Sequence, residues 1–338
     1  MDKSKTSQQT GTIHMAGEWK RTFKLWRRRL TDPLIAAALW LFLLVFQFFS
    51  LQALRRLARV IGSVACRFDK RDRRLVQENL RVAFPQMTED EIKVMAPQIF
   101  ASGSLLLLEI VWAARHREQL ATHVHIPEAL MEFVRRPGGC LLVTPHLGNW
   151  EILGQAGVAA GVPCAVVAKP LRNALVYKLV MESRRRNGLD VIDTEGAVRQ
   201  IVKALRKNYA IGILVDQCVR IPEGGVFIDF FGLPATCTRA PASLAMKLNV
   251  PVVDLACVRT RTGFELVYET LPKPAPEYTD ELQLTQDIIL ANEKLIRARP
   301  AEYSWLYRRW RHIPADATPE ERRRYPAYAG DVEWKARG

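Results

Sequence analysis

Short apolar runs alternate with amphipathic stretches through the middle of the chain, and this alternation is the feature that most limits the fold. After Pro137-Gly138-Gly139, runs with the length and composition of buried strands occur at Cys140–Thr144, Cys164–Ala168, Val191–Ile192 and Ala210–Val215. Candidate helices separate them, near 150–160, 174–186 and 196–207. Strands that alternate with helices form βαβ units. We therefore expect one α/β domain with a mainly parallel central sheet.

The flanking sequence extends this pattern in both directions. Further strands are expected at 226–231, 250–258 and 264–269, followed by a closing helix at 282–299. Upstream, Thr88-x-x-Glu91 is a capping pattern that opens a helix. The apolar segment 101–114 (ASGSLLLLEIVWAA) that follows is either a buried helix or a membrane-facing surface.

A stretch of 22 residues without a charged side chain, 33–54, lies near the amino end. As a helix it spans roughly 33 Å, which is enough to cross the hydrocarbon core of a bilayer. It is too long for a signal peptide, starts too far from Met1 and lacks a following cleavage site. We expect a membrane anchor that spans the bilayer or is deeply embedded in it. A buried core helix and a tilted or interfacial helix remain alternatives.

Positive charge is concentrated on both sides of this segment. The chain has 49 Lys and Arg against 35 Asp and Glu, a net charge of +14. Residues 1–74 hold 16 basic and 5 acidic residues, or +11, which leaves +3 for residues 75–338. A nucleic-acid-binding protein would spread basic residues over a folded face, so we expect an anionic membrane as partner and no nucleic acid. The predicted parts are a basic tail (1–32), an anchor helix (33–54), a main domain (55–315) and a C-terminal tail (316–338).

The six cysteines indicate a reducing compartment. None forms a Cys-x-x-Cys pair, and most lie in apolar runs such as GGCLLV and DLACV, as buried free thiols do. Without a cleavable signal, the main domain is expected on the cytoplasmic side of the membrane. The two-residue spacing of His123 and His125 is weak evidence for a metal, and we expect neither a metal nor a cofactor.

The motif Thr144-Pro-His-Leu-Gly-Asn-Trp-Glu151 stands between the first predicted strand and its helix. Sites in α/β sheets form at the carboxyl ends of strands, so His146 is placed for chemistry. Glu151 follows in the first turn of the helix, where the chain can fold back to bring the two side chains together. The carboxylate would hold the imidazole tautomer while the other ring nitrogen takes a proton. The structural alternative has His146 capping the helix and Glu151 paired with an arginine.

The block HLGNWE resembles the His-x-x-x-x-Asp/Glu motif of glycerolipid-type acyltransferases, and more closely that of the lipid A late (secondary) acyltransferases. Other segments resemble that family in the same order: RRLVQENLRVAFP upstream, then KPLRN, RRRNGLDVI, LVDQ, GGVFIDFFGLPATCT and PAEYSWLYRRWR downstream. The resemblance runs from about residue 33 to about residue 312. Cys218 departs from it, because members often have an acidic or other polar residue after the Asp-Gln pair.

The resemblance implies a single glycerolipid-acyltransferase-like domain and an O-acyltransferase of lipopolysaccharide biosynthesis at the bacterial inner membrane. The reaction it implies moves a fatty acyl chain from acyl-acyl carrier protein to a hydroxyl of a lipid A precursor. His146 is then the general base and Glu151 the carboxylate that orients it. The implied substrate-binding residues are Arg184, Asn149, Asp216 and Gln217. Since neither a Gly-x-Ser-x-Gly elbow nor a nucleophilic cysteine stands beside the pair, we expect direct transfer without an acyl-enzyme.

Other interpretations stay open at this stage. Acceptor choice depends on pocket shape, so a lysophospholipid or an aminolipid is a possible acceptor for an enzyme of the same superfamily. A non-catalytic membrane-surface protein is the alternative outside enzymes. The arginines at 184–186 are also consistent with a solvated run on a helix surface. We expect Phe230 and Phe231 to fill the core.

Overall fold

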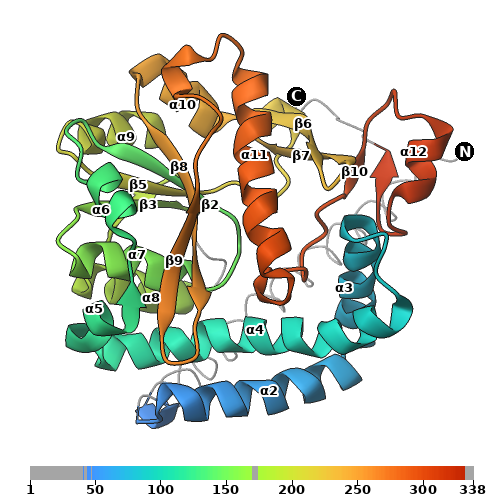
Figure 1. Cartoon of the computed structure of the whole chain (residues 1–338), viewed down its shortest axis with the longest axis horizontal. Helices are drawn as coiled ribbons and strands as arrows, with labels where there is room; N and C mark the ends of the chain where they lie inside the picture. The colour runs from blue at the N-terminus through green and yellow to red at the C-terminus, as the bar shows by residue number, and fades with distance from the viewer. Residues whose placement is uncertain (1–40, 42–43, 47, 170–173, 332–338) are drawn as a thin grey trace, which may run out of the picture.

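A seven-stranded sheet forms the centre of the computed structural model, which describes residues 41, 44–46, 48–169 and 174–331 (Figure 1). Its strand order is β1-β9-β8-β2-β5-β3-β4, and each neighbouring pair is parallel except β8 and β9. The expected α/β fold with a mainly parallel central sheet is therefore confirmed. The strands are β1 (Val124–His125), β2 (Cys140–Thr144), β3 (Cys164–Ala168), β4 (Asp190–Asp193), β5 (Ala210–Leu214), β8 (Val252–Arg259) and β9 (Phe264–Glu269).

Helices cover both faces of the sheet because the central strands are apolar on both sides. In β2, Leu141 and Val143 point into one core, whereas Cys140 and Leu142 point into the other. The first core is closed by α9 (Ala197–Leu205), α10 (Ala240–Leu248) and α11 (Glu281–Ala298). The second is closed by α4 (Glu89–Arg115), α5 (Leu120–His123), α6 (Glu128–Val134) and α7 (Trp150–Ala159). Between β3 and β4 lies α8 (Ala174–Arg186).

One predicted strand belongs to a separate hairpin. β6 (Gly225–Phe230) pairs antiparallel with β7 (Leu233–Thr238) outside the main sheet. Phe230 and Phe231 are buried there against Trp305 and Trp310, which confirms their expected place in the core. All six cysteines are free and all but the half-buried Cys218 are buried, as expected.

The helix α4 begins at the predicted capping box, with Thr88 and Glu91 bonding reciprocally. Among the described residues it alone has the length and apolar composition to cross a membrane. Of the most apolar 18-residue stretch of this helix, 44% is buried in the domain. Leu108 and Trp112 of that helix pack into the second core. One side of the segment 101–114 is therefore buried in the core, whereas Leu107 on another side is 56% exposed.

The first part of the predicted anchor segment 33–54, residues 33–40, lies outside the described residues, as does the whole predicted tail 1–32. The described end of the segment is not one continuous helix, because the chain turns before Ser50, which caps a new helix, α2 (Leu51–Phe68). Residues 51–54 are thus the first turn of α2, which packs along α4 (Figure 1). The next helix is α3 (Lys70–Ala83).

The described part of the predicted C-terminal tail, 316–331, packs against the domain. It contains α12 (Pro319–Arg324) and β11 (Gly330–Asp331), and β11 pairs with β10 (His312–Ile313). The Tyr325 hydroxyl donates a hydrogen bond of 2.8 Å to the carbonyl of Pro234. This segment is part of the folded unit.

Candidate active site

The loop between β2 and α7 holds His146 in a fixed position. Its backbone is bonded on both sides: the Gly148 N–H donates to the carbonyl of Glu302 at 3.1 Å, and the Ser304 N–H donates to the carbonyl of His146 at 2.9 Å. Gly148 has φ +64°, and a Cβ there would collide with the carbonyl oxygen of Cys257. Only glycine allows both this φ angle and this approach at low energy.

His146 pairs with Asp216, which follows β5. Its ring Nδ1 lies 2.6 Å from Oδ1 of Asp216, and its backbone N–H donates to Oδ2 at 3.0 Å. Asp216 is 2% exposed and also accepts a hydrogen bond from the hydroxyl of buried Tyr303. Burial alone would raise its pKa, but the neighbouring imidazole and these hydrogen bonds hold the pKa of Asp216 below its ordinary value. An ionised carboxylate only accepts, so Nδ1 carries the hydrogen and Nε2 has the lone pair.

The exposed side of the imidazole faces Gln217 and Trp150. The amide Nε2 of Gln217 lies 3.1 Å from Nε2 of His146, and Gln217 is exposed. The Trp150 ring meets the imidazole edge to face, with ring centroids 4.9 Å apart. Nε2 therefore lies on the open side of the loop, in contact with a side chain that can turn away.

Glu151 pairs with Arg184 of α8 in a bidentate ion pair. Nε and Nη2 of Arg184 lie 3.1 Å and 2.5 Å from the two carboxylate oxygens, and the side chains are 16% and 13% exposed. No hydrogen bond among the described residues joins Glu151 to His146, so the expected pairing of these two side chains is wrong. The carboxylate beside the ring is Asp216, and Glu151 has the arginine partner of the structural alternative.

The strand register explains why Asp216 takes that position. Thr144, the last residue of β2, pairs with Leu214, the last residue of the adjacent parallel strand β5. Two residues beyond each of them stand His146 and Asp216, which places their side chains together. Glu151 lies in the first turn of α7, and its side chain contacts Arg184 of α8.

Asn149 lies beneath the loop and is fully buried, although it was expected to bind substrate. Its side-chain oxygen caps α7 by accepting from the Ile152 N–H at 3.1 Å, and its amide donates to Glu109 at 3.1 Å. Asp216, also expected to bind substrate, is likewise buried and engaged. Of the predicted substrate-binding residues, Arg184 is partly exposed and Gln217 is exposed.

A buried charge cluster supports the loop from the side of α4. Glu109 is fully buried, and its carboxylate oxygens Oε1 and Oε2 accept hydrogen bonds from Nε of Arg259 at 2.9 Å and 3.0 Å. Arg259 also bonds Glu302 at 3.1 Å and the Ser102 hydroxyl at 2.9 Å. Burial opposes the charge, but Glu109 and Glu302 hold the pKa of the Arg259 guanidinium above its ordinary value. Sequence reasoning missed this cluster; its signal was a lone acid in the apolar run LLLLEIVW.

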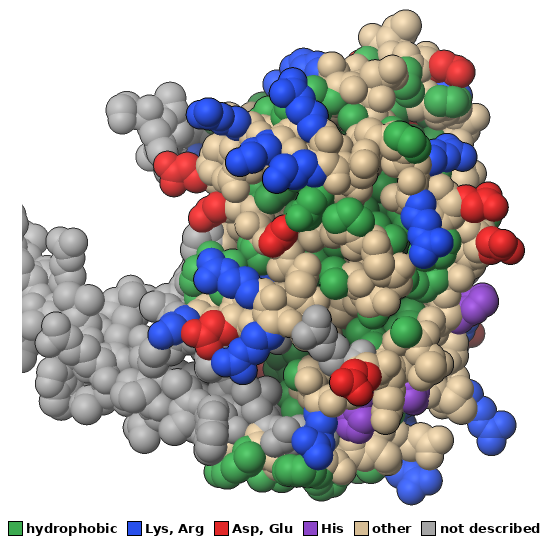
Figure 2. All heavy atoms as spheres, turned by 90° about the vertical axis from the view of Figure 1, so that its left-hand side faces the viewer, with side chains coloured by type: hydrophobic (Ala, Val, Ile, Leu, Met, Phe, Trp, Pro, Cys, Tyr) green, Lys and Arg blue, Asp and Glu red, His purple; other side chains and the backbone are tan. Residues whose placement is uncertain are grey.

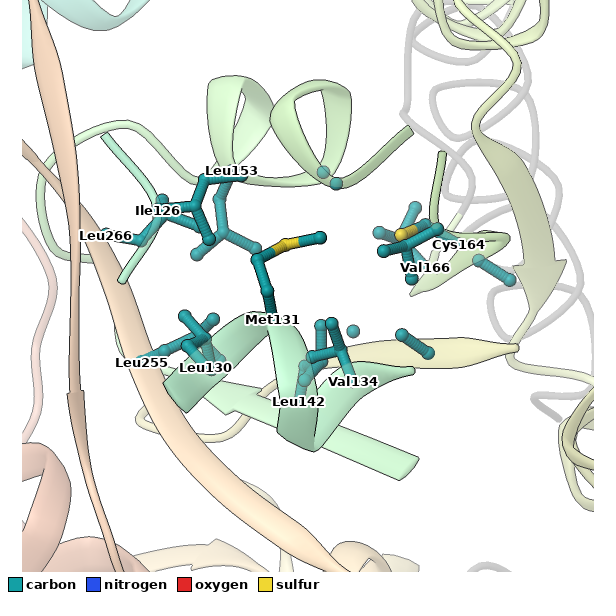
Figure 3. A pocket seen from close by; sticks show the side chains of 16 residues that line it. Ile126, Leu130, Met131, Val134, Leu142, Leu153, Cys164, Val166, Leu255 and Leu266 are labelled. Atoms are coloured by element: carbon teal, nitrogen blue, oxygen red, sulfur yellow. The ribbon is translucent and has the colours of Figure 1, made fainter. Parts of the chain in front are cut away.

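An apolar cavity of about 40 Å³ lies between α6, α7 and the sheet (Figure 3). Met131 reaches toward its middle, with Leu153 on one side and Val166 on another. Ligand pockets are usually roughly 300–1,000 Å³, so this cavity is a gap in core packing. A cavity without polar partners stays dry. Among the described residues no three His, Cys, Asp or Glu side chains gather as metal ligands.

Comparison with known proteins identifies the family. The model of the bacterial lipid A biosynthesis acyltransferases matches residues 22–312. The chain belongs to this family. The expected resemblance is thereby confirmed, and this member of the lipid A biosynthesis acyltransferases is an enzyme that transfers acyl groups.

Individual relatives are more distant. The lipid A biosynthesis lauroyltransferase of Escherichia coli K12 is 27% identical over 77% of this chain and 85% of its own length. A phosphatidylinositol mannoside acyltransferase of Mycolicibacterium smegmatis is 28% identical over 55% of this chain and 60% of its own length. The solved acyltransferase PlsC of Thermotoga maritima has a TM-score of 0.32 and 13% identity, with 72% of this chain and 98% of that chain covered.

Proposed function

We propose that this acyltransferase moves a fatty acyl chain from acyl-acyl carrier protein to a hydroxyl of a lipid A precursor, with His146 as general base. The observation that carries the proposal is the pairing of His146 with buried Asp216, which leaves Nε2 on the open side of the loop. Membership of the lipid A biosynthesis acyltransferase family supports the choice of reaction and acceptor.

In the proposed reaction, Nε2 of His146 removes the proton of the acceptor hydroxyl as its oxygen attacks the thioester carbonyl. The acceptor hydroxyl takes the position that the Gln217 amide holds in the free protein. The tetrahedral intermediate then expels the carrier thiolate, which receives the proton from the imidazolium, so that an ester and a thiol are released. Asp216 stabilises the imidazolium while it exists and keeps the ring in the required tautomer.

Glu151 and Arg184 are proposed to act together on the charge that develops beside the histidine. Nε and Nη2 of Arg184 donate hydrogen bonds to the Glu151 carboxylate, and no described residue accepts a hydrogen bond from Nη1. A cation held in a fixed position near the reacting carbonyl stabilises an oxyanion better than a mobile one. We assign Glu151 to the catalytic site as the residue that positions Arg184, and Arg184 to the oxyanion or to an anionic group of the substrate.

The experiment that tests the general base replaces His146 and compares it with a histidine elsewhere. General-base catalysis is worth about 10²–10⁴-fold, so His146→Ala should reduce transfer from acyl-acyl carrier protein to a lipid A precursor by that factor. His125→Ala is the matched control, because His125 is exposed on β1, at the far edge of the sheet from β2 and β5. Near-normal transfer by a folded His146→Ala protein would rule out the proposed mechanism.

The acceptor is tested with the same purified protein. A relative named as a phosphatidylinositol mannoside acyltransferase favours a second candidate, an acyltransferase for another membrane lipid. Parallel assays with a lipid A precursor, a lysophospholipid, an aminolipid and a phosphatidylinositol mannoside distinguish the candidates. We expect the lipid A precursor to be acylated fastest, at the cytoplasmic face of the bacterial inner membrane. Comparison of lipid A masses from cells with and without the protein identifies the chain transferred.

A further inference from the structure

The helix α2 has one buried side and no acidic residue. Its sequence, LQALRRLARVIGSVACRF, contains four arginines and neither Asp nor Glu. Leu54, Ala58 and Gly62 form the buried side against α4. At Gly62 the two helices touch so closely that a Cβ would collide with the backbone of Ala101. The packed side of α2 is therefore fixed, and its other sides face away from the domain.

The outward side of α2 carries large apolar residues. Val60, Ile61, Val64 and Phe68 are exposed by 62%, 38%, 51% and 76%, and their spacing puts them on one helix face. We call these four residues the apolar stripe. Of the fifteen large apolar side chains exposed in the described part of the chain, nine lie between Leu41 and Phe68. Figure 2 shows hydrophobic side chains gathered at the lower edge, where Figure 1 has α2.

A row of cations runs beside the apolar stripe. Arg56, Arg59 and Arg67 are exposed on the neighbouring side of α2, and Lys70 and Arg71 continue it at the start of α3. None of the five forms an ion pair with a described residue, although many surface cations elsewhere pair with acids, as Arg81 does with Glu89. Scattered apolar residues are normal on a surface, but a contiguous patch marks a contact site.

We propose that α2 is an interfacial helix that lays its apolar stripe into the headgroup boundary of an anionic bilayer. An amphipathic helix with a cationic flank and exposed Val, Ile and Phe binds a membrane surface through apolar burial and attraction to anionic lipid. The cations beside the stripe then lie at the depth of the lipid phosphates. This contact is additional to the predicted anchor at 33–54, whose last four residues are the first turn of α2.

The same contact brings the catalytic edge of the sheet to the membrane. Arg55 of α2 donates to the carbonyls of Thr260 and Gly263 at 2.6 Å and 2.7 Å, just after the end of β8. β8 lies beside β2 in parallel, so its carboxyl end shares an edge with His146. Figure 1 shows α2 as the lowest element, below α4 and the turn between β8 and β9. An acceptor lipid in that bilayer would thus be presented on the side of the catalytic loop.

Environment-sensitive labels on the full chain test the proposal without reference to activity. In a Cys218→Ser background, which removes the only native thiol that is not buried, Val64→Cys and Ser63→Cys are labelled with a nitrobenzoxadiazole dye. Ser63 is exposed on the cationic side of the same helix and is the matched control. Phosphatidylglycerol vesicles should blue-shift the label at 64 and slow its quenching by aqueous iodide several-fold, with a much smaller effect at 63.

The outcomes distinguish a membrane from other partners. Phosphatidylcholine vesicles should give a weaker response, and added salt should reduce the response to phosphatidylglycerol, because the cations contribute through screened charge. Equal quenching at 63 and 64 with anionic vesicles would refute the proposal. Protection at 64 that rises with protein concentration in the absence of vesicles would refute it in favour of a second copy of the chain. If Val64→Cys does not fold, Phe68→Cys, at 76% exposure, replaces it.

Discussion

Two carboxylates stand within reach of the catalytic loop, but they have different partners. Asp216 is buried and bonds the ring and backbone of His146, whereas Glu151 is partly exposed and bonds Arg184. The two carboxylates therefore contribute to catalysis in different ways. Asp216 controls the tautomer and charge of the imidazole, and Glu151 controls the position of the Arg184 guanidinium.

Asp216→Asn should therefore lower kcat by about 10²–10⁴-fold with little change in KM, because an amide can hold the imidazole in the wrong tautomer and does not stabilise imidazolium. Glu151→Gln should leave the His146 pair intact and change KM as well as kcat, since it releases Arg184. Steady-state kinetics with acyl-acyl carrier protein give kcat and KM for both variants and so test these two expectations. The opposite pattern, with KM affected by the Asp216 variant alone, would assign the roles the other way round.

Elements distant in sequence are joined beneath the loop by the buried cluster of Glu109 and Arg259. These residues stand 150 positions apart, on α4 and at the end of β8, and Glu109 also holds the amide of Asn149 at the start of α7. An ion pair removed from water stabilises a structure only while both partners are present. The cluster thus makes the position of the catalytic loop depend on α4.

Glu109→Gln should destabilise the folded protein by about 3–5 kcal/mol, because it removes one of the two carboxylates that compensate the buried charge of Arg259 and leaves only Glu302. Glu89 is the matched control on the same helix: it pairs with Arg81 at the exposed end of α4, so Glu89→Gln should change the unfolding midpoint little. Denaturant unfolding followed by circular dichroism gives both values. Equal midpoints for the two variants would mean that the buried cluster does not hold the loop.

The stability of the whole molecule should depend on pH through a second buried aspartate, Asp254 of β8. Asp254 is fully buried, bonds the amide of Asn292 on α11, and has a second oxygen without a partner among the described residues. Burial raises the pKa of Asp254 well above its ordinary value. The native state therefore keeps a proton that the unfolded state loses near pH 4, so stability falls as pH rises from about 4 to the native pKa.

Asp254→Asn should remove this fall, because an amide keeps a donor at the same place without a charge. At neutral pH the variant should be as stable as the parent or more stable, by about 1–3 kcal/mol. Thermal unfolding of both proteins between pH 4 and pH 9 measures the difference. A variant that unfolds at lower temperature than the parent at pH 8 would contradict the assignment of a protonated Asp254.

Local sequence patterns predicted most of the elements. The strands at 140–144 and 164–168, the capping box at Thr88 and the closing helix were all found where their residues indicated. The position of HLGNWE directly after the run 140–144 also predicted that His146 follows that strand, which is β2. Each of these features depends on residues within a few positions of one another.

Other features could not be predicted in that way. The partner of His146 stands 70 residues further along, and the residues that form the support of the loop are 40 to 200 positions apart. Glu151, five residues from His146, was expected as its partner because it is near in sequence. The order of strands in the sheet decided otherwise, by placing the end of β5 beside the end of β2.

The sequence by itself determined the α/β class, the family, the position of His146 and the concentration of positive charge near the amino end. Tertiary structure alone decided which carboxylate bonds the histidine, which arginine holds Glu151, and which side of α2 is left apolar and exposed. The physical reason is the range of the forces involved. Backbone propensity and apolar periodicity act between neighbours in the chain, whereas ion pairs and packing act between whatever residues the strand order brings within a few ångströms.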